Sequence, residues 1–301
     1  MDAWLNGTFV PAESVTVPVL THSFCRGSAI FEVLDLVETA DGPALFRVDE
    51  HIERLFSSAE RMHMVMPLSK QELHEAIVET ARRSNLPRAV IRVMAYYGEP
   101  DLAFVPKNTV VSVAVFCFTF SEVIGCTYEE GTRPVEAGIT SIRKLSPRTV
   151  DVHAKVAGNY VSPFLAKWEA VQKGLSEPIL LSEEGFVTEG ALCNVFFVRE
   201  GVLCGARSEA VLGGITRDSI VEIAHDLDIR YEECDLTRAD ALDSDEAFFS
   251  GSCIRVRPIR TINGEPVGEE CPGPVTTEIQ SELERAYAGR SERHREWLTK
   301  V

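Results

Sequence analysis

Lys155 is the residue whose type and surroundings in the sequence best fit covalent chemistry. Lysine is scarce in this chain, with seven lysines against 23 arginines, and Lys155 opens the run Lys-Val-Ala-Gly-Asn-Tyr. A lysine amine is nucleophilic only when it is deprotonated, and a semi-buried apolar setting favours that form. The small residues after Lys155 suit such a setting. Taken alone, however, a lysine before a predicted helix is more simply explained as solvated.

Glu189 places a carboxylate at a second position of interest. It stands in the run Thr188-Glu189-Gly190, where a predicted strand enters a glycine turn and returns to a strand. A carboxylate fixed there can hold a pyridinium nitrogen in its protonated, electron-withdrawing form. An acid beside a glycine more commonly faces water, so this residue alone leaves both interpretations open.

Thr216 and Ser252 place hydroxyl groups next to glycines. Gly213-Gly214 precedes Ile215-Thr216 at the start of a predicted helix, and Ser252 follows Gly251. Paired glycines let the backbone approach an anion, and the first-turn N–H groups of a helix bind phosphate. A glycine pair before a helix is weak evidence when it stands alone.

Together, a lysine nucleophile, a carboxylate for a ring nitrogen and an anion-binding helix start match what pyridoxal phosphate requires. On these residues the chain resembles the class IV (fold type IV) pyridoxal-phosphate enzymes, which include branched-chain aminotransferases, D-amino-acid aminotransferases and aminodeoxychorismate lyases. The resemblance covers nearly the whole chain, from Trp4-Leu5-Asn6-Gly7 to the run Cys271–Thr276. Its motifs are specific jointly, although each is weak singly.

The resemblance implies roles for individual residues. Lys155 would form the Schiff base with the cofactor, and the Asn-Tyr pair that follows it distinguishes it from Lys144. Glu189 would bind the pyridine nitrogen, and Tyr160 would lie near the phenolic oxygen. The implied phosphate-binding residues are Arg54, Ile215, Thr216 and Ser252.

The resemblance also implies an activity, partners and a fold. The activity is transfer of an amino group between an amino acid and a 2-oxo acid, with Lys155 as the general base that moves a proton from Cα to C4′. The family is built from homodimers or multiples of them, in which a loop of one subunit closes the other's site. Its α+β fold has a smaller N-terminal α/β domain and a larger C-terminal β-rich domain with helices, and the cofactor lies between them.

Substrate choice depends on the segment that contains Arg26. Branched-chain enzymes usually have a tyrosine in place of Arg26 and a glycine in place of Val33, whereas the second half of this chain is branched-chain-like. Arg26 and Arg92 can each bind a carboxylate bidentately, although Arg26 also suits an ion pair at a dimer interface. The expected substrate-binding residues are Arg26, Phe31, Arg92 and Cys253.

Arg255 and Arg257 follow Ser252 and share one face of a predicted strand, directed toward a dicarboxylate or toward solvent. If these arginines line the pocket, glutamate and 2-oxoglutarate form one substrate couple. The other substrate is then a D-amino acid or an atypical branched-chain-like one. The alternatives are an ordinary L-branched-chain aminotransferase, a lyase of the aminodeoxychorismate type that releases pyruvate without an amino acceptor, and a non-catalytic binding protein.

The elements that must position these residues are predicted from periodicity and turn chemistry. Asn6-Gly7 predicts the turn of a hairpin, and Asp41-Gly42 predicts the turn between a second pair of strands. Asp49 is expected to cap one helix, and Ser69 with Glu72 is expected to form a capping box at the start of another. Strands are expected at 89–97, 109–120, 178–181, 186–188, 194–198 and 202–204, and further helices at 159–173, from 216, and at 274–288. A small N-terminal domain over 1–120, an inter-domain linker over 121–133 and a large cofactor-binding domain over 134–301 are expected.

The composition excludes several classes of function. Acidic residues outnumber basic ones by 46 to 30, giving a net charge of -16, which repels nucleic acid and anionic lipid. The longest apolar run, 110–120, is shorter than the about 20 residues that a membrane span needs. The Met-Asp-Ala-Trp start shows no signal-peptide pattern, so we expect a cytoplasmic protein. The eight cysteines and seven histidines lack metal-ligand spacing, which favours free thiols and no metal site.

Overall fold

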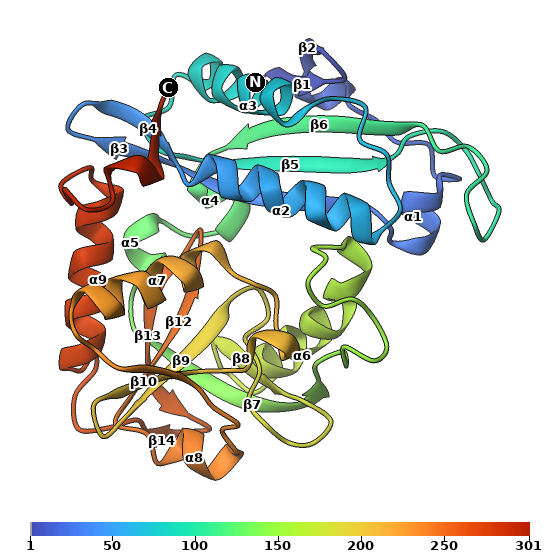
Figure 1. Ribbon diagram of the computed structural model, residues 1–301. Coiled ribbons are helices and arrows are strands. Elements are labelled where there is room, and N and C mark those ends of the chain that lie inside the picture. Colours follow the sequence, from blue (N-terminus) through green and yellow to red (C-terminus); the bar gives the residue numbers. More distant parts are fainter. Residues whose placement is uncertain (1) are drawn as a thin grey trace. The chain divides into compact units, whose positions relative to one another are not determined.

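The computed structural model describes residues 2–301 and contains two compact units, each built from one sheet and helices (Figure 1). The first unit comprises the chain up to Cys126 together with Ala154–Gly158 and Ala286–Val301. The second comprises Thr127–His153 and Asn159–Arg285. The α+β architecture is therefore the predicted one. Ala154–Gly158 and Ala286–Val301, which the sequence placed in the domain 134–301, pack with the N-terminal half.

The first unit contains a seven-stranded antiparallel sheet in the order β15-β4-β3-β5-β6-β1-β2. Its central strands carry the longest pairing, and β3 runs beside β5 from Ile30 opposite Ala95 to Leu36 opposite Ala89. The strands are β1 (Asp2–Leu5), β2 (Thr8–Pro11), β3 (Ile30–Thr39), β4 (Gly42–Phe46), β5 (Ala89–Tyr97), β6 (Val111–Phe118) and β15 (Leu298–Lys300).

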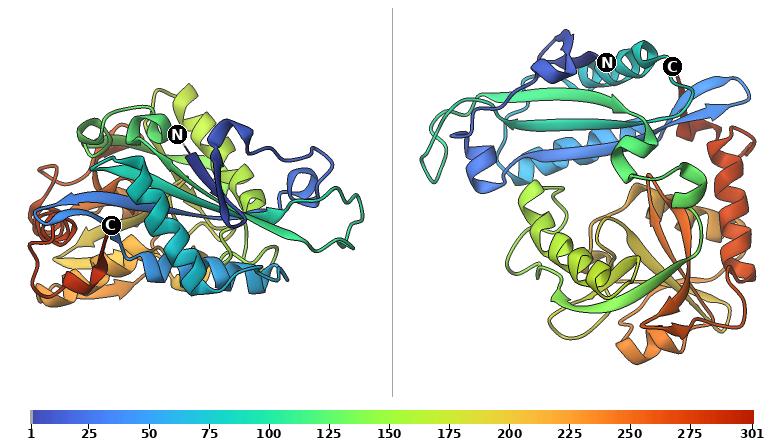
Figure 2. Two further views of the ribbon diagram at one scale, coloured as in Figure 1. Left: turned by 90° about the horizontal axis from the view of Figure 1, so that it is seen from above. Right: turned by 180° about the vertical axis from the view of Figure 1, so that it is seen from behind.

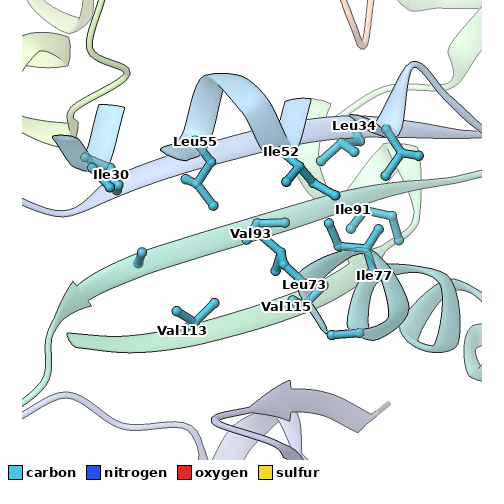
Figure 3. Close-up of a cluster of buried hydrophobic side chains, with 14 of the residues drawn as sticks. Ile30, Leu34, Ile52, Leu55, Leu73, Ile77, Ile91, Val93, Val113 and Val115 are labelled. Atoms are coloured by element: carbon cyan, nitrogen blue, oxygen red, sulfur yellow. The ribbon is translucent and has the colours of Figure 1, made fainter. Parts of the chain in front are cut away.

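Two helices, α2 (Val48–Arg61) and α3 (Lys70–Ser84), pack side by side against this sheet (Figures 1 and 2). Their apolar residues meet the inward-facing residues of β3, β5 and β6 in one buried cluster, in which Leu55 and Leu73 from the helices approach Ile91 and Val93 (Figure 3). Each such fully buried side chain contributes about 1.5–3 kcal/mol to folding. The cluster makes β3 and α2 a rigid support for the polar residues that they carry.

The two predicted helix starts have different outcomes. Ser69 and Glu72 form the predicted capping box of α3. Asp49 does not cap α2, because the N-cap residue is Arg47, which has a left-handed φ of 50° and makes no side-chain cap. Asp49 instead lies in the first turn, where its charge favours the helix dipole.

The segment Ala154–Gly158 is held in the first unit by its backbone. Ala157 and Gly158 donate N–H bonds of 2.8 Å to the carbonyls of Ala29 and Gly27. A Cβ on Gly27 would lie 2.9 Å from Gly158 Cα, and Gly27 has a φ of 68°, so this crossing requires glycine. The segment therefore lies along the start of β3 in a fixed register.

The second unit contains an eight-stranded mixed sheet in the order β11-β10-β9-β12-β13-β7-β8, with β14 paired to β13. The pairs β7–β8, β13–β7 and β10–β11 are parallel, and the others are antiparallel. The strands are β7 (Val135–Arg143), β8 (Glu177–Leu181), β9 (Asn194–Arg199), β10 (Val202–Gly205), β11 (Tyr231–Glu233), β12 (Glu246–Gly251), β13 (Arg255–Ile262) and β14 (Glu265–Pro266).

The remaining helices are short or belong to the second unit. Helix α6 packs on β7 and β8, whereas α7 packs on β12 and β11. Part of the predicted linker 121–133 is helical, because Thr119 and Thr127 each form a capping box that starts a turn of helix. The bounds are α1 (His22–Arg26), α4 (Phe120–Ile124), α5 (Tyr128–Gly131), α6 (Val161–Gln172), α7 (Ile215–Asp226), α8 (Arg238–Leu242) and α9 (Pro274–Tyr287).

Within residues 2–301, no helix is long and apolar enough to cross a membrane, and no cluster of side chains has the composition of a metal site. All eight cysteines in this range are free thiols.

Candidate active site

Lys155 is anchored on both sides of its peptide in the first unit. Its backbone N–H donates to Ser58 Oγ at 3.0 Å, and its carbonyl accepts a 3.1 Å bond from the N–H of Phe31. Its Nζ lies 5.3 Å from the centre of the Phe31 ring. Helix α2 and strand β3 therefore fix the backbone from which the half-buried side chain extends.

Arg92 lies against the same aromatic ring. Its guanidinium carbon is 4.9 Å from the centre of the Phe31 ring, and its Nε contacts Met94 Sδ at 3.4 Å. Three residues that the sequence singled out, Lys155, Phe31 and Arg92, are therefore neighbours. Both cations face a buried ring, an arrangement that is favourable by about 0.5–2 kcal/mol per pair.

Arg54 is held by a buried carboxylate that the sequence analysis did not identify. Its Nε and Nη2 each donate a 2.7 Å bond to a different oxygen of Glu32, and His51 Nδ1 lies 2.7 Å from Glu32 Oε2. Glu32 and His51 are each about 1% exposed. The two-bond fork fixes the plane of the guanidinium.

The charges of this cluster are set by burial and by each other. Burial alone would raise the pKa of Glu32, but the charges and hydrogen bonds of Arg54 and His51 outweigh it and hold the pKa well below its usual range. Burial lowers the pKa of His51, and its bond to Glu32 opposes this only in part. At neutral pH the cluster is thus an arginine–carboxylate pair with a neutral imidazole. In the sequence, the signal for this cluster was Glu32 within an apolar strand pattern, together with His51 and Arg54, which are three residues apart on α2.

Arg26 stands apart from these contacts. It is the last residue of α1, its side chain is exposed, and its Nη1 donates a 3.2 Å bond to the carbonyl of Cys25. No acidic side chain in the described part of the chain pairs with it. Among residues 2–301, Arg26 therefore has no ion-pair partner.

Glu189 lies in the second unit and forms an ion pair with Lys144, and both side chains are only 10% exposed. Lys144 Nζ donates to Glu189 Oε1, and the backbone N–H of Leu212 donates to Glu189 Oε2 at 3.3 Å. Glu189 is thus not a turn acid in open water. Lys144, which the sequence set aside as a candidate nucleophile, is its partner.

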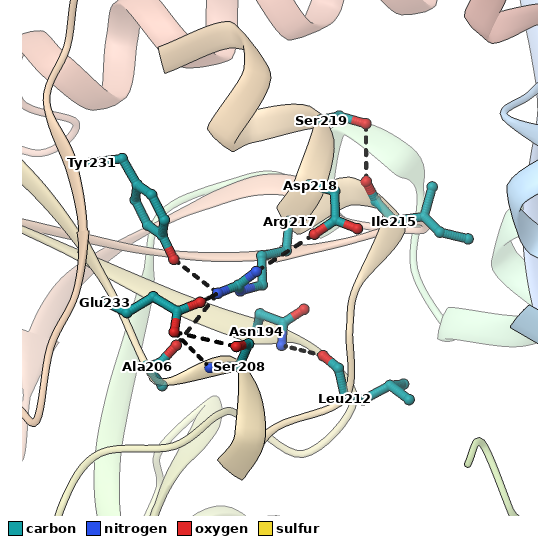
Figure 4. Close-up of polar contacts among 10 residues, drawn as sticks. All are labelled: Asn194, Ala206, Ser208, Leu212, Ile215, Arg217, Asp218, Ser219, Tyr231 and Glu233. Atoms are coloured by element: carbon teal, nitrogen blue, oxygen red, sulfur yellow. Dashed lines mark hydrogen bonds and ion pairs between the residues drawn. The ribbon is translucent and has the colours of Figure 1, made fainter. Parts of the chain in front are cut away.

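Asn194 links the Glu189 turn to the start of α7. Its Nδ2 donates a 3.2 Å bond to the carbonyl of Leu212, as Figure 4 shows. Gly214, the N-cap residue of α7, lies so close to Asn194 Oδ1 that a Cβ at this position would overlap it. Glu189 and Asn194 therefore fix the segment Leu212–Gly214 relative to the carboxylate.

Helix α7 begins with no side-chain cap, and its residues Ile215 and Thr216 are buried. Arg217 fixes the first turn of the helix: its Nη2 bonds Tyr231 Oη and Glu233 Oε1, each at 2.8 Å (Figure 4). Because a helix of this length has a partial positive charge at its N-terminus, the uncapped end is suited to an anion.

The remaining predicted residues also belong to the second unit. Ser252 and Cys253 lie in the turn between β12 and β13. A Cβ on Gly251, just before them, would lie 3.5 Å from Cys193 Cβ in the Glu189 turn. Tyr160 is the half-buried N-cap residue of α6.

Arg255 and Arg257 are each paired with a carboxylate. Arg255 is buried, donates a 2.5 Å bond to Glu284 Oε2 and lies over the Tyr128 ring. Arg257 lies 3.3 Å from Glu177 Oε1. Both charges are therefore compensated inside the second unit.

The comparisons identify the family. The family described as amino-transferase class IV matches residues 29–262. The chain belongs to the class IV aminotransferases. Like them it is a pyridoxal-phosphate-dependent transaminase, which confirms the predicted family, enzyme class and cofactor.

This class IV aminotransferase is similar along its whole length to curated relatives. It is 33% identical over 299 residues to the branched-chain-amino-acid aminotransferase of Pseudomonas aeruginosa, and 34% identical over 301 residues to that of Escherichia coli strain K12. Each match covers 99% of this chain and 96% of the relative.

Solved structures support the same assignment and confirm fold type IV. The branched-chain aminotransferase of Thermoproteus uzoniensis with norvaline matches with a TM-score of 0.94 and 34% identity, covering 99% of this chain and 98% of that one. The branched-chain amino acid aminotransferase of Escherichia coli matches with a TM-score of 0.94 and 32% identity, with the same coverage of both chains.

The residues of this class IV aminotransferase fit the cofactor. Pyridoxal phosphate needs an amine, an acceptor for its ring N–H and donors for its phosphate. The first unit supplies Lys155 and a fixed arginine, and the second supplies the buried, ion-paired Glu189 and the uncapped start of α7.

Proposed function

We propose that this class IV aminotransferase transfers the amino group of a branched-chain-type amino acid to 2-oxoglutarate, with glutamate as the other product. The observation that carries the proposal is the pair of cations on the Phe31 ring, Lys155 at 5.3 Å and Arg92 at 4.9 Å. A substrate whose amine is directed to Lys155 would then have a guanidinium within reach of its α-carboxylate.

In this proposal each cofactor-binding residue has one task. Glu189 accepts the ring N–H, Tyr160 lies beside the phenolic oxygen, and Lys155 carries the aldehyde carbon. The phosphate is bound by Arg54, Ile215, Thr216 and Ser252. The Glu32 fork orients Arg54, and Asn194 fixes the start of α7, so the proposal rests on residues whose positions are already set before binding.

Bound pyridoxal phosphate supplies an electron sink conjugated to the substrate Cα. With the cofactor bound, Lys155 would act as the general base, its Nζ taking the proton from the substrate Cα and returning it to the cofactor. The hydrogen bonds of the Lys155 backbone to Ser58 and Phe31 fix the point from which the side chain extends while the amine takes up and returns the proton. The net reaction would convert an amino acid and a 2-oxo acid into the corresponding 2-oxo acid and amino acid.

The choice of a branched-chain-type substrate is supported by the relatives, whose names are those of branched-chain-amino-acid aminotransferases. A D-amino acid is the second candidate, and Arg26 is the observation in its favour. Its exposed guanidinium makes no ion pair within the described chain, so it is available to a substrate carboxylate. The D-amino-acid and L-amino-acid forms of the proposal differ in which arginine binds that carboxylate.

The test is a half-reaction with single amino acids and no acceptor, followed by the loss of the cofactor's visible absorbance. We expect L-leucine, L-valine and L-glutamate to bleach the protein, and Arg92→Gln to slow bleaching by about 100-fold, the loss of one bidentate charge-assisted contact. Arg26→Gln should leave these rates within about two-fold. Arg82→Gln, on an exposed helix face, is the matched control.

Other outcomes of the half-reaction change the proposal in defined ways. Bleaching by D-glutamate or D-alanine that Arg26→Gln abolishes would establish the D-amino-acid candidate in its place. Release of pyruvate from an amino substrate without any acceptor would identify the lyase activity instead. A protein that takes up no pyridoxal phosphate would contradict both candidates.

We further propose that two copies associate through helix α6. Its exposed apolar residues follow helical spacing along one stripe, and Phe164 and Trp168 are 60% and 58% exposed. The other members of this stripe are Val161, Leu165 and Val171. Homodimers are what the family resemblance implies, and an unpartnered apolar stripe of this size is costly to leave in water.

Replacing Trp168 with glutamate should halve the mass in sedimentation equilibrium, because a charge would be buried without a partner. Val65→Glu, at a residue that is 77% exposed outside α6, should leave the mass unchanged. A dimer that survives Trp168→Glu together with Phe164→Glu would place the interface elsewhere.

A further inference from the structure

We infer that Lys144 is a positioning residue for the cofactor: its ammonium group holds the Glu189 carboxylate by an ion pair and keeps it directed at the ring nitrogen. The inference rests on the proposed role of Glu189 as the acceptor of the ring N–H. It assigns a function to the second lysine of the site region, which is neither the nucleophile nor a surface residue.

The sheet of the second unit places the two side chains together. Lys144 directly follows β7, and its N–H donates a 3.0 Å bond to the carbonyl of Leu181. Glu189 lies on the other side of the same strand, β8, and its carbonyl accepts a 2.9 Å bond from the N–H of Leu180. Leu181 and Leu180, consecutive residues of β8, thus bond to the backbones of Lys144 and Glu189, respectively. The side chains of Lys144 and Glu189 form their ion pair next to this end of the strand.

The Glu189 carboxylate is fixed at both of its oxygens. Lys144 holds Oε1, and the Leu212 N–H holds Oε2 at 3.3 Å. The turn that follows is tightly packed, since a Cβ on Gly190 would lie 2.6 Å from Cys193 Sγ and 3.0 Å from the Phe249 ring. The carboxylate therefore has a set direction, which Leu212 alone, through one long bond to a neutral donor, would hold weakly.

The charge of Lys144 matters because both side chains are nine-tenths buried. A carboxylate in such a place is costly without a nearby cation. Without Lys144, the Glu189 carboxylate would lose the donor to its Oε1 and would turn toward water. The ring nitrogen would then lose an anionic partner in a fixed position, and the protonated ring would lose its stabilisation.

A purely structural role for Lys144 makes a different prediction. A residue that only ties β7 to the Glu189 turn would change the melting temperature and leave the bound cofactor unaltered. The test therefore measures the protonation of the ring nitrogen directly, by NMR of holoenzyme reconstituted with pyridoxal phosphate labelled with ¹⁵N in the ring. The dissociation constant for pyridoxal phosphate is measured on the same proteins.

Three variants separate charge from shape. Lys144→Arg keeps the cation and should retain the wild-type ¹⁵N resonance. Lys144→Met removes it and should shift the resonance toward that of the unprotonated ring, with cofactor binding about 10- to 100-fold weaker, the loss of one charge-assisted hydrogen bond. Lys144→Gln keeps an N–H donor without the charge. If Lys144→Met does not fold, the ¹⁵N resonance and the dissociation constant of Lys144→Gln are compared with those of Lys144→Arg instead. Lys167→Met, which breaks the Lys167–Glu177 pair in the same unit, is the matched control.

An unchanged resonance and an unchanged dissociation constant in folded Lys144→Met and Lys144→Gln would overturn the inference. Glu189→Gln distinguishes this from a failure of the proposed function. If Glu189→Gln shifts the resonance while the Lys144 variants do not, Glu189 keeps its role and Lys144 loses the one inferred here. If Glu189→Gln shifts nothing either, the role of Glu189 itself is wrong.

Discussion

Replacing Lys155 with alanine is expected to abolish transamination, with a loss of about 10⁴-fold or more in kcat, because in the proposed function one amine both carries the cofactor and moves the proton. The methyl group of alanine replaces the side chain that lies over the Phe31 ring, while the backbone bonds to Ser58 and Phe31 do not involve it. The variant should therefore fold. Steady-state kinetics with 2-oxoglutarate as acceptor, and the visible spectrum after incubation with pyridoxal phosphate, measure both consequences.

The control for this change is Lys107→Ala, at an exposed lysine of the first unit, which should retain wild-type kinetics and colour. Lys144→Ala is informative beside it. If Lys155→Ala kept the activity and Lys144→Ala lost the visible band, the covalent lysine would be Lys144, and the assignment drawn from the Asn-Tyr pair would be wrong.

Replacing Gly214 with alanine is expected to weaken binding of pyridoxal phosphate by about 100-fold, the loss of roughly two hydrogen bonds to a charged group. The new methyl group would overlap Asn194 Oδ1, and Asn194 is 8% exposed and bonded to Leu212. Either Asn194 breaks its bond or the start of α7 moves. Both displace the first-turn N–H groups from the position that the phosphate requires.

Gly213 offers a matched control for Gly214. A Cβ on Gly213 meets no atom within 4 Å, so Gly213→Ala should bind the cofactor within about two-fold of the wild type. Equilibrium titration of the two variants with pyridoxal phosphate makes the comparison. Equal affinities in the two would show that the start of α7 does not hold the phosphate.

Local sequence patterns predicted the elements that local interactions determine. The Asn6-Gly7 hairpin, the Asp41-Gly42 turn and the Ser69–Glu72 capping box each depend on a few neighbouring residues, and all three form. Strand β5 has the predicted bounds, 89–97, because its apolar run is buried on both faces. Strand β12 was not predicted, and β13 was predicted only at its start, where Arg255 and Arg257 alternate along one strand face.

The same distinction between local and long-range interactions applies to the candidate site residues. Lys155, Glu189 and the Gly213–Thr216 run could be proposed as site residues from the sequence because each has a recognisable neighbourhood. The pairing of Glu189 with Lys144 could not be found, because the two residues are 45 positions apart in the sequence and meet only when β7 and β8 lie side by side. Glu32 and His51 were missed because their pairing depends on the packing of α2 on β3, which brings together residues 19 and 22 positions apart. A glutamate in an apolar strand pattern was a signal, but it did not identify the partners.

The first unit is assembled from three separate stretches of chain, and this has a consequence for synthesis and for engineering. Its sheet receives its last strand, β15, only when Lys300 has left the ribosome, after the whole of the second unit has been made. Residues 154–158, which include Lys155, also belong to the first unit, although in the sequence they lie between two segments of the second unit. Neither unit is therefore a single continuous segment of the chain. Recombination at a single crossover would divide at least one of the two sheets between parents.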